Sequence, residues 1–526
     1  MLGILSFVGF TAIVAVIAYL STRKTNEKTA DGYFLGGRSL TAGVIAGSLL
    51  LTNLSTEQIV GLNGSAYDSG LSVMAWETLA AIAIVVTAIF LLPRYLKSGL
   101  TTIPQFLADR FDVATKSMTS GLFLTGYAIV LLPVILYTGS LALSGMFNVP
   151  ELLGVSQSTS IWICVWAIGL IGSIYAIFGG LKAVAVSDSI NAIGLLIGGI
   201  LVPVLGLLAI GDGNVMEGIR TLTPKDENYF SSIGSNDAPV PFYTLFTGMM
   251  LVQLFYWGTN QQIIQRALGA KNLKEGQKGL MLAACIKILG PLILVVPGLI
   301  AYHMFGDNLA AADEAYPSLV RKVMPTPLLG FFAAVIFGAI LSSFNSVLNS
   351  SVTLFGIDIY KQHINPEASE AKTVKMGKRF GIGLALAAMI IAPFIAEAGN
   401  IFDYLQEFNG IYSIPILTII FVGFVTKRVP AIAAKIGLLS GSILYILSQF
   451  VFPDFADNLG LHFLDVMALL FVLNTLIMLI IGKFKPRSEA YVQQYTEQVA
   501  ITPWKHVKLS GLLVVTIVIV IYVMFR

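Results

Sequence analysis

The sequence predicts an all-α polytopic membrane protein with about 14 transmembrane helices. Of its 526 residues, 56% are hydrophobic and only 12% are charged, whereas soluble domains have about 25% charged residues. Apolar stretches of about 20 residues, the length that crosses a bilayer as a helix, recur along the whole chain. Lysine and arginine are concentrated in alternate loops. These three observations predict a single transmembrane domain over residues 1–526.

The predicted spans account for nearly all of the apolar residues, and the longest hydrophilic insertions between them are 212–241 and 305–326. The fourteen predicted spans run near 2–20, 41–62, 71–93, 118–147, 159–178, 183–211, 242–263, 276–304, 327–359, 374–397, 400–425, 430–451, 461–482 and 507–525.

The first span indicates the orientation of the chain. Arg23 and Lys24 follow it, whereas a secretory signal has its positive charges in front, so we expect a retained helix with its N-terminus outside. Inner loops then hold most of the basic residues, as the positive-inside rule requires. Fourteen spans place both termini outside. The basic residues left in the outer loops are Arg220, Lys225, Arg321 and Lys322.

Composition argues against several other classes of protein. The net charge is only +3 and no basic, aromatic-rich stretch is present, so we expect no nucleic-acid partner. Cys164 and Cys285 lie in apolar helices, which leaves no disulfide framework and no CxxC metal site. The four histidines are scattered, and no nucleophile–base or metal constellation is evident, so we expect no enzyme activity.

Two spans are interrupted by polar residues. In the second span the segment from Thr52 to Gln58 is almost entirely polar, and in the seventh the segment from Tyr256 to Gln262 is polar and contains Gly258. A broken helix at membrane depth is tolerated where its freed carbonyls line a cavity or bind an ion. Two breaks five spans apart predict an inverted repeat of spans two to six and seven to eleven. The alternative for each is a polar helix face packed on its neighbours.

Lys287 is the only charged residue in the apolar run from Leu280 to Tyr302, and it lies about eleven residues into the predicted span, near mid-depth. One alternative is that its ammonium extends to an interface. Otherwise it needs a carboxylate, and Glu77 and Glu57 are available. A paired Glu77 and Lys287 would form a site that is neutral overall, which suits a polyol or sugar better than an anion.

The ninth span carries a polar stripe of Ser342, Ser346, Asn349 and Thr353 at helical spacing. Ser342 is followed directly by Ser343. Two adjacent hydroxyls and carbonyls from a broken helix would supply an oxygen cage, and a hard cation such as sodium prefers oxygen ligands. The alternative is a Ser/Thr face that only packs.

An ordered set of motifs extends over nearly the whole chain: Gly32 to Arg38, Asn53 to Gln58, Gly179 to Ala183, Tyr256 to Gln261, Gln265 to Arg266, Asp358 to Lys361 and Asp403 to Gln406. This set resembles the solute:sodium symporter family, in its bacterial sodium/glucose (galactose) cotransporter-like branch. The resemblance implies the leucine-transporter-type five-plus-five inverted repeat, with an extra N-terminal helix at 2–20, repeats at 41–211 and 242–425, and three extra helices at 430–525. It also implies a bacterial inner (plasma) membrane.

The same resemblance implies roles for individual residues. Four positions depart from the family pattern. Gln253 replaces an Asn that binds solute, Ala80 replaces a Ser, Trp76 replaces a Tyr, and Leu62 replaces a Met. The sodium ligands would be the carbonyls of Leu51, Leu54 and Ala339 with the hydroxyls of Ser342 and Ser343. The solute would contact Asn53, Gln58, Glu77, Gln253, Tyr256, Lys287 and Gln406. The gates would be Trp76 and Phe402 outside and Tyr256 inside, and Asp188 would lie on the sodium exit route or serve as an interfacial carboxylate.

We therefore expect a secondary active symporter that couples sodium influx to uptake of a small neutral hydroxyl-rich solute, with Na⁺ as the co-transported ion. The solute could instead be an amino acid, inositol or a carboxylate, although a carboxylate is disfavoured because no arginine is expected at mid-depth. A channel or a non-transporting solute sensor is the alternative from another class.

Overall fold

The computed structural model describes residues 2–22, 29–397 and 401–526. Arg23, Lys24 and position 400, where one predicted span begins, lie outside the described residues. Within them the chain is helical nearly throughout, and the sole β-type pairing is an isolated bridge between Leu40 and Ala270. The predicted all-α class is confirmed.

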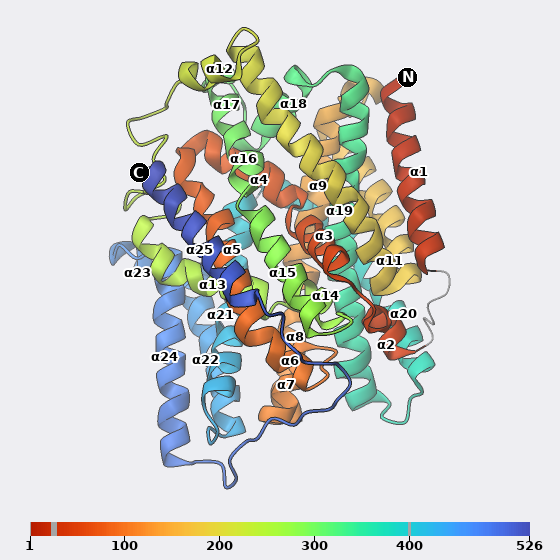
Figure 1. Ribbon diagram of the computed structural model, residues 1–526, viewed down its shortest axis with the longest axis vertical. Coiled ribbons are helices and arrows are strands. Elements are labelled where there is room, and N and C mark those ends of the chain that lie inside the picture. The colour runs from red at the N-terminus through yellow and green to blue at the C-terminus, as the bar shows by residue number, and fades with distance from the viewer. Residues whose placement is uncertain (1, 23–28, 398–400) are drawn as a thin grey trace.

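Most helices are joined by short connections, apart from the longer segments 222–241 and 485–506 (Figure 1). The elements that matter below are α1 (Leu2–Thr22), α3 (Ala42–Asn53), α4 (Thr56–Ser69), α5 (Ala75–Val86), α6 (Leu92–Lys97), α7 (Ile103–Arg110), α8 (Val113–Gly126), α11 (Gln157–Ile210), α13 (Gly248–Gly258), α14 (Gln261–Leu268), α15 (Leu273–Lys287), α16 (Gly290–Leu294), α17 (Val296–Phe305), α19 (Thr326–Thr353), α20 (Glu370–Ile391), α21 (Ile401–Val425), α22 (Ala431–Ile446), α24 (Phe463–Phe484) and α25 (Val507–Met524).

Ten helices of the described chain are long and apolar enough to cross a membrane, or eleven if the bent pair α15 and α16–α17 is one span. This is fewer than the fourteen predicted. The other three predicted spans are also helical. The part of α1 that enters the count is Ser6–Ser21, α3 is a shorter apolar helix that ends at the first break, and the span 242–263 is divided between α13 and α14. The interruptions predicted from polar residues thus account for two of these three spans.

Gly180 separates two spans inside the continuous element α11. Its φ of 57° and ψ of −175° are open to glycine and strained for other residues. The chain turns there, which accounts for the separate predicted spans 159–178 and 183–211. A Cβ at this position would lie 3.1 Å from the backbone oxygen of Tyr33.

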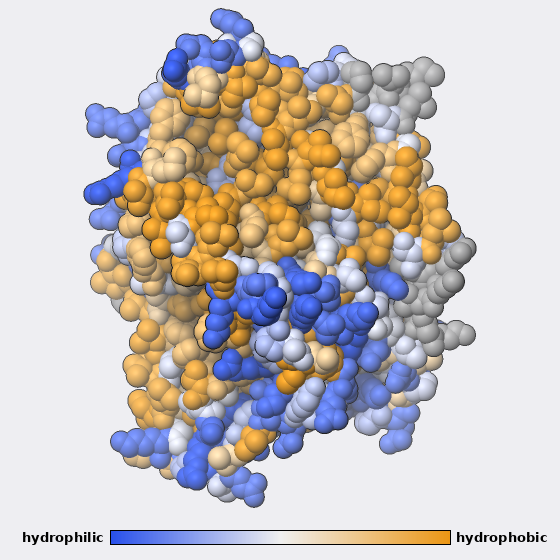
Figure 2. Space-filling view, in the orientation of Figure 1, coloured by the Kyte–Doolittle hydropathy of each residue, from blue (hydrophilic) through white to orange (hydrophobic). Residues whose placement is uncertain are grey.

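The helices pack into one bundle with a continuous apolar core. α11 lies against α19, α3 and α1, while α21, α22 and α24 form a second group at the C-terminal side (Figure 1). Large apolar side chains remain exposed on outer helices, among them Leu476 and Ile480 of α24 and Leu512 and Leu513 of α25. Figure 2 shows the resulting broad hydrophobic surface, with hydrophilic residues gathered toward the two ends. Such a surface suits contact with lipid.

The segment 485–506 runs as an extended strap across the basic end of the molecule before α25 begins. Gln493 Nε2 donates to the carbonyl of Arg94 at 2.7 Å, and Leu273 N donates to the carbonyl of Ala500 at 2.9 Å. The strap therefore joins the end of α6 to the start of α15. It continues into α25, which packs on α5 and α15.

Replacing Gly180 with Ala is expected to destabilise the protein by about 1–3 kcal/mol, because the new side chain must occupy a strained backbone conformation and press on Tyr33. The measurement is thermal unfolding in detergent. Gly121→Ala is the control, since a Cβ there meets no atom within 4 Å and the residue lies inside α8. Equal unfolding temperatures for both variants would contradict the assignment of Gly180 as an obligatory glycine.

Candidate functional site

The second predicted span is broken where its polar residues indicated. α3 ends at Asn53, Leu54 has φ −75° and ψ 55°, Ser55 is extended, and α4 begins at Thr56. Asn and Ser compete with the helix for backbone hydrogen bonds, which favours an end at this point. Within the described chain, no backbone amide donates to the carbonyls of Leu51 and Leu54. The break thus leaves two buried acceptors available to a ligand.

Hydroxyl groups of α19 face this break. Ser343 Oγ donates to the carbonyl of Thr52 at 3.1 Å, and Ser346 Oγ lies 3.1 Å from Thr52 Oγ1. Ser342 is also buried, and its hydroxyl lies near Asp188 without a hydrogen bond of good geometry among the described residues. Ala339, one turn before Ser343, is fully buried. The residues expected to hold sodium therefore lie on two adjoining elements, α3 and α19.

The seventh predicted span is broken as well, but its break is occupied by protein groups. α13 ends at Gly258, whose carbonyl accepts a hydrogen bond from Tyr95 OH at 3.0 Å. The side chain of Asn260 caps α14 through Gln262 N and accepts from Tyr127 OH at 2.6 Å. This break is fixed by side chains that leave little room for an ion.

A cavity lies between the two breaks. Its wall contains every residue expected to bind solute except Lys287, and also Ala80, one of the positions that depart from the family pattern. Leu62, a second departure, is buried in α4 outside this wall. The lining residues are Asn53, Gln58, Trp76, Glu77, Ala80, Val252, Gln253, Tyr256, Trp257 and Gln406.

Lys287 lies just behind this wall in a buried ion pair. Its ammonium donates to Glu77 Oε2 and to Asn53 Oδ1, and it sits 5.6 Å from the centre of the Trp257 ring. Both Lys287 and Glu77 are 1% exposed. The alternative in which Lys287 extends to an interface is therefore wrong. The site combines one positive and one negative side chain, so its net charge is close to zero.

A close approach of backbone makes room for this pair. α15 ends at Lys287, and α16 starts at Gly290 after a bend of 50° between the two halves of the span. A Cβ at position 290 would overlap Glu77 Oε2. Glycine at this bend therefore allows the carboxylate to reach Lys287.

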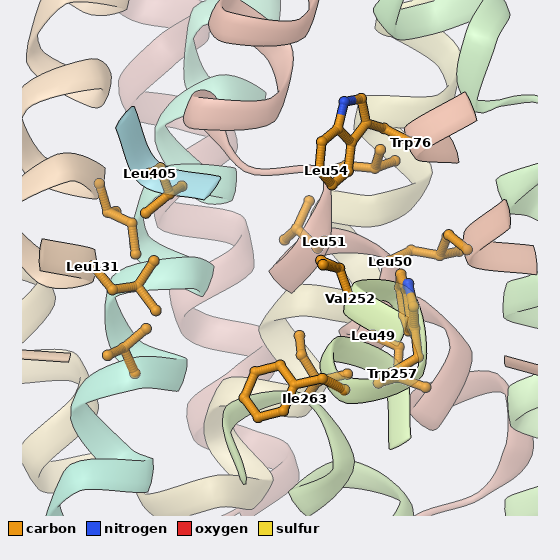
Figure 3. Packing of buried hydrophobic residues seen from close by; sticks show 14 of the residues in the cluster. Leu49, Leu50, Leu51, Leu54, Trp76, Leu131, Val252, Trp257, Ile263 and Leu405 are labelled. Atoms are coloured by element: carbon orange, nitrogen blue, oxygen red, sulfur yellow. The ribbon is translucent and has the colours of Figure 1, made fainter. Parts of the chain in front are cut away.

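The aromatic residues expected to act as gates lie around the cavity. The rings of Trp76 and Phe402 meet edge to face, with centres 5.3 Å apart and planes at 84°. Tyr256 packs against Trp257 at 5.4 Å. Figure 3 shows Trp76 close to Leu54, with Val252 and Trp257 of α13 in the same apolar cluster as Leu49 to Leu51.

Asp188 belongs to a second buried polar group behind α3 and α19. Ser48 Oγ donates to Asp188 Oδ2 at 2.6 Å and accepts from Arg266 Nε at 3.2 Å. Arg266 also donates to Ser346 Oγ and to the carbonyl of Gln262. Asp188 is fully buried within the protein, and its two expected roles, on the sodium exit route or as an interfacial carboxylate, stay predictions.

Arg266 is part of one of the motifs that resemble the family, but the sequence predicts neither its burial nor its contacts. No arginine was expected at membrane depth, yet Arg266 is fully buried in α14. It lies just beyond the predicted end of the span at 263, where a charge indicates a loop. One sequence signal could have indicated this burial, namely the amphipathic segment that follows the polar break. The guanidinium of Arg266 donates hydrogen bonds to Ser48, Ser346 and Gln262, and Arg266 does not line the cavity.

Comparisons with known proteins agree with this architecture. Residues 33–441 match the model of the sodium:solute symporter family. The chain is 48% identical to an uncharacterized symporter of Escherichia coli, YidK, over 99% of this chain and 90% of that protein. It is 32% identical to a sodium/glucose cotransporter of Vibrio parahaemolyticus, over 84% of this chain and 83% of that protein. It is 29% identical to the human sodium/myo-inositol cotransporter 2, over 82% of this chain and 67% of that protein.

Solved structures resemble the chain in fold. A sodium-coupled sialic acid symporter in a substrate-bound outward-open state superposes with a TM-score of 0.79 at 20% identity, over 94% of this chain and 99% of that one. Mhp1, a nucleobase-cation-symport-1 family transporter, superposes with a TM-score of 0.54 at 13% identity, over 86% of this chain and 94% of that one. These likenesses confirm the expected leucine-transporter-type fold class.

The variant Lys287→Met is expected to lower stability by about 3–5 kcal/mol, because it leaves the Glu77 carboxylate buried without its cation. The double variant Glu77→Gln/Lys287→Met should recover most of that loss, since no buried charge then remains unpaired. The stability of the single and the double variant is measured by their unfolding in detergent. A single variant as stable as the double variant would show that the pair is not coupled.

Proposed function

Because the chain belongs to the sodium:solute symporter family, it is a sodium-coupled transporter and not an enzyme, and we propose that it takes up a small, neutral, hydroxyl-rich solute such as a hexose. Sodium is the co-transported ion. The observation that carries the proposal on the solute is the cavity between the two broken helices. Its wall offers amides, a phenol and indole faces, and the charge of its one carboxylate, Glu77, is neutralised by Lys287 directly behind the wall.

A neutral polyol suits this cavity better than a charged solute. An anion would need a free cation, but the Lys287 ammonium already binds Glu77 and Asn53, and Arg266 is held behind α3. The amides of Gln58 and Gln406 provide donors and acceptors for hydroxyl groups. The rings of Trp76, Tyr256 and Trp257 can cover an apolar face of a ring-shaped solute. Solute ligands in this proposal are Asn53, Gln58, Glu77, Tyr256, Lys287 and Gln406, with Gln253 in the same wall.

Sodium in this proposal binds at the break between α3 and α4. Its ligands are the carbonyls of Leu51, Leu54 and Ala339 and the hydroxyls of Ser342 and Ser343. Two features support the assignment: the carbonyls of Leu51 and Leu54 accept no backbone hydrogen bond within the described chain, and Ser343 already contacts the break. Asp188 lies close to Ser342 and is proposed to receive the ion on its way to the cytoplasm.

Alternating access would couple the two sites. Sodium would hold the break against α19, and Asn53, at the end of α3, would thereby be placed in the solute cavity. The coupling is reciprocal, because each ligand raises the affinity for the other by the same factor. Trp76 with Phe402 would close the outer side and Tyr256 the inner side. The membrane potential adds about 2.3 kcal/mol per charge per 100 mV to the driving force.

The same proposal includes an orientation in a bacterial inner membrane with both termini outside. The basic residues that contact the strap, such as Arg94 and Arg428, lie at one end of the molecule. Both termini lie in the other half (Figure 1). The positive-inside rule assigns the basic end to the cytoplasm.

Uptake of labelled sugars and polyols into proteoliposomes tests the solute class. Glucose, galactose and myo-inositol are compared with an amino acid and a carboxylate, with and without an inward sodium gradient. We expect at least one neutral polyol to accumulate above its outside concentration when sodium is present. Accumulation of charged solutes alone would contradict the proposal, and equilibration without accumulation would indicate a channel.

Ser343→Ala is expected to abolish sodium-dependent uptake, because it removes both a proposed sodium ligand and the hydrogen bond to the carbonyl of Thr52. Ser351→Ala on the same helix is the matched control, since its buried hydroxyl bonds only to the carbonyl of Val347 one turn away. Uptake rates are normalised to the amount of reconstituted protein. Normal coupled uptake by Ser343→Ala would remove the ion-site assignment.

A further inference from the structure

The side chain of Gln253 has both of its polar atoms engaged by protein groups. Its Nε2 donates to the carbonyl of Trp76 at 2.9 Å, and its Oε1 accepts from Trp257 Nε1 at 3.2 Å. Gln253 is 5% exposed, and it lines the cavity together with both tryptophans. Although it stands where the family resemblance places a solute ligand, its orientation is already set by two protein partners, which leave one N–H and one lone pair unused.

Chemistry restricts which side chain can make this bridge. A backbone carbonyl only accepts a hydrogen bond, and an indole N–H only donates one, so the bridging group needs one donor and one acceptor. A carboxamide supplies both, whereas an ionised carboxylate has no donor. Asn is one methylene shorter than Gln. Gln253 and Trp257 are four residues apart on α13 and share a helix face, while Trp76 lies on α5.

The two tryptophans that Gln253 joins reach the cavity wall from different helices, Trp76 from α5 and Trp257 from α13. Trp76 packs edge to face on Phe402, which makes it half of the proposed outer gate. Trp257 lies under the ammonium of Lys287, which in turn binds Glu77 and Asn53. A continuous series of contacts thus leads from the outer gate through Gln253 to the end of α3, where the helix breaks.

Gln58 differs from Gln253 in this respect. It lines the same cavity from α4, and its Oε1 is buried without a hydrogen-bond partner among the described residues. A buried carbonyl oxygen without a partner is unfavourable, and a solute hydroxyl would supply the missing hydrogen bond. Of these two glutamines, Gln58 is therefore the one whose amide oxygen still needs a partner.

We propose that Gln253 is a positioning residue that fixes Trp76 and Trp257 relative to each other and so couples the outer gate to the Lys287 site, while Gln58 contacts the solute directly. This proposal rests on the solute site proposed above and refines it. The solute then meets the Trp257 indole held in place beside the backbone that carries Trp76, which favours a ring-shaped molecule with one apolar face over a flexible chain.

A measurement without solute tests the bridge. Replacing Trp162, Trp166 and Trp504 with Phe leaves Trp76 and Trp257 as the only tryptophans of the five. In this background Gln253→Met keeps the length of the side chain but removes both hydrogen bonds. We expect a red shift of tryptophan emission and stronger quenching by acrylamide, whereas the control Gln58→Met should change neither. Unchanged emission and quenching in Gln253→Met would overturn the proposal.

A double-mutant cycle tests the same bridge during transport. The probes are labelled glucose and myo-inositol, and the readout is the KM and maximal rate of sodium-driven uptake. Trp257→Phe removes one buried hydrogen bond and should lower uptake by about tenfold, Gln253→Met removes two and should lower it by at least as much, and the double variant should be no worse than about the worse single variant. A direct solute ligand at position 253 would instead give effects that multiply to about 100-fold.

The two experiments separate the possible failures. If the wild-type protein transports neither probe, the proposed solute class is wrong for these compounds, and the fluorescence measurement still decides the role of Gln253. Size-exclusion chromatography checks folding. If Gln253→Met is not monodisperse, Gln253→Asn replaces it, since Asn keeps the amide but is too short to reach both partners. Wild-type emission from Gln253→Asn would likewise overturn the proposal.

Discussion

The backbone hydrogen bonds missing between α3 and α4 are the constraint on which the rest of the site depends. A polar backbone group left unpaired in a bilayer costs several kcal/mol, so a break at this depth persists only where other groups take over. Ser343 of α19 takes over part of that role at Thr52, while Leu51 and Leu54 keep free carbonyls. The same break separates Asn53 from Gln58, so that both residues reach one cavity.

The two interrupted spans differ in how their backbone groups are satisfied. At the second break, Tyr95, Tyr127 and Asn260 satisfy the backbone and leave a fixed connection between α13 and α14. At the first break the acceptors remain available. An ion bound there would complete the hydrogen-bonding requirements of α3, whereas solute would be held mainly by side chains around α13. The buried Glu77–Lys287 pair keeps the space between them electrically neutral.

Much of this site could be predicted from the sequence, because the signals were local. Polar residues in apolar spans indicated both breaks, and a lone lysine at mid-depth required a carboxylate such as Glu77. Contacts between distant segments could not be predicted in this way. The partners of Gln253 depend on how α5 lies against α13, and the burial of Arg266 depends on how α14 packs against α3 and α19. The strap at 485–506 has no apolar periodicity that would indicate its course.

A high-resolution structure determined in sodium-containing buffer, and again with choline in place of sodium, tests the central claim most directly. We predict density for an ion between the carbonyls of Leu51 and Leu54 and the hydroxyls of Ser342 and Ser343, present in sodium and absent in choline. A helix that continues unbroken through Leu54, or a break without an ion in both conditions, would contradict the account.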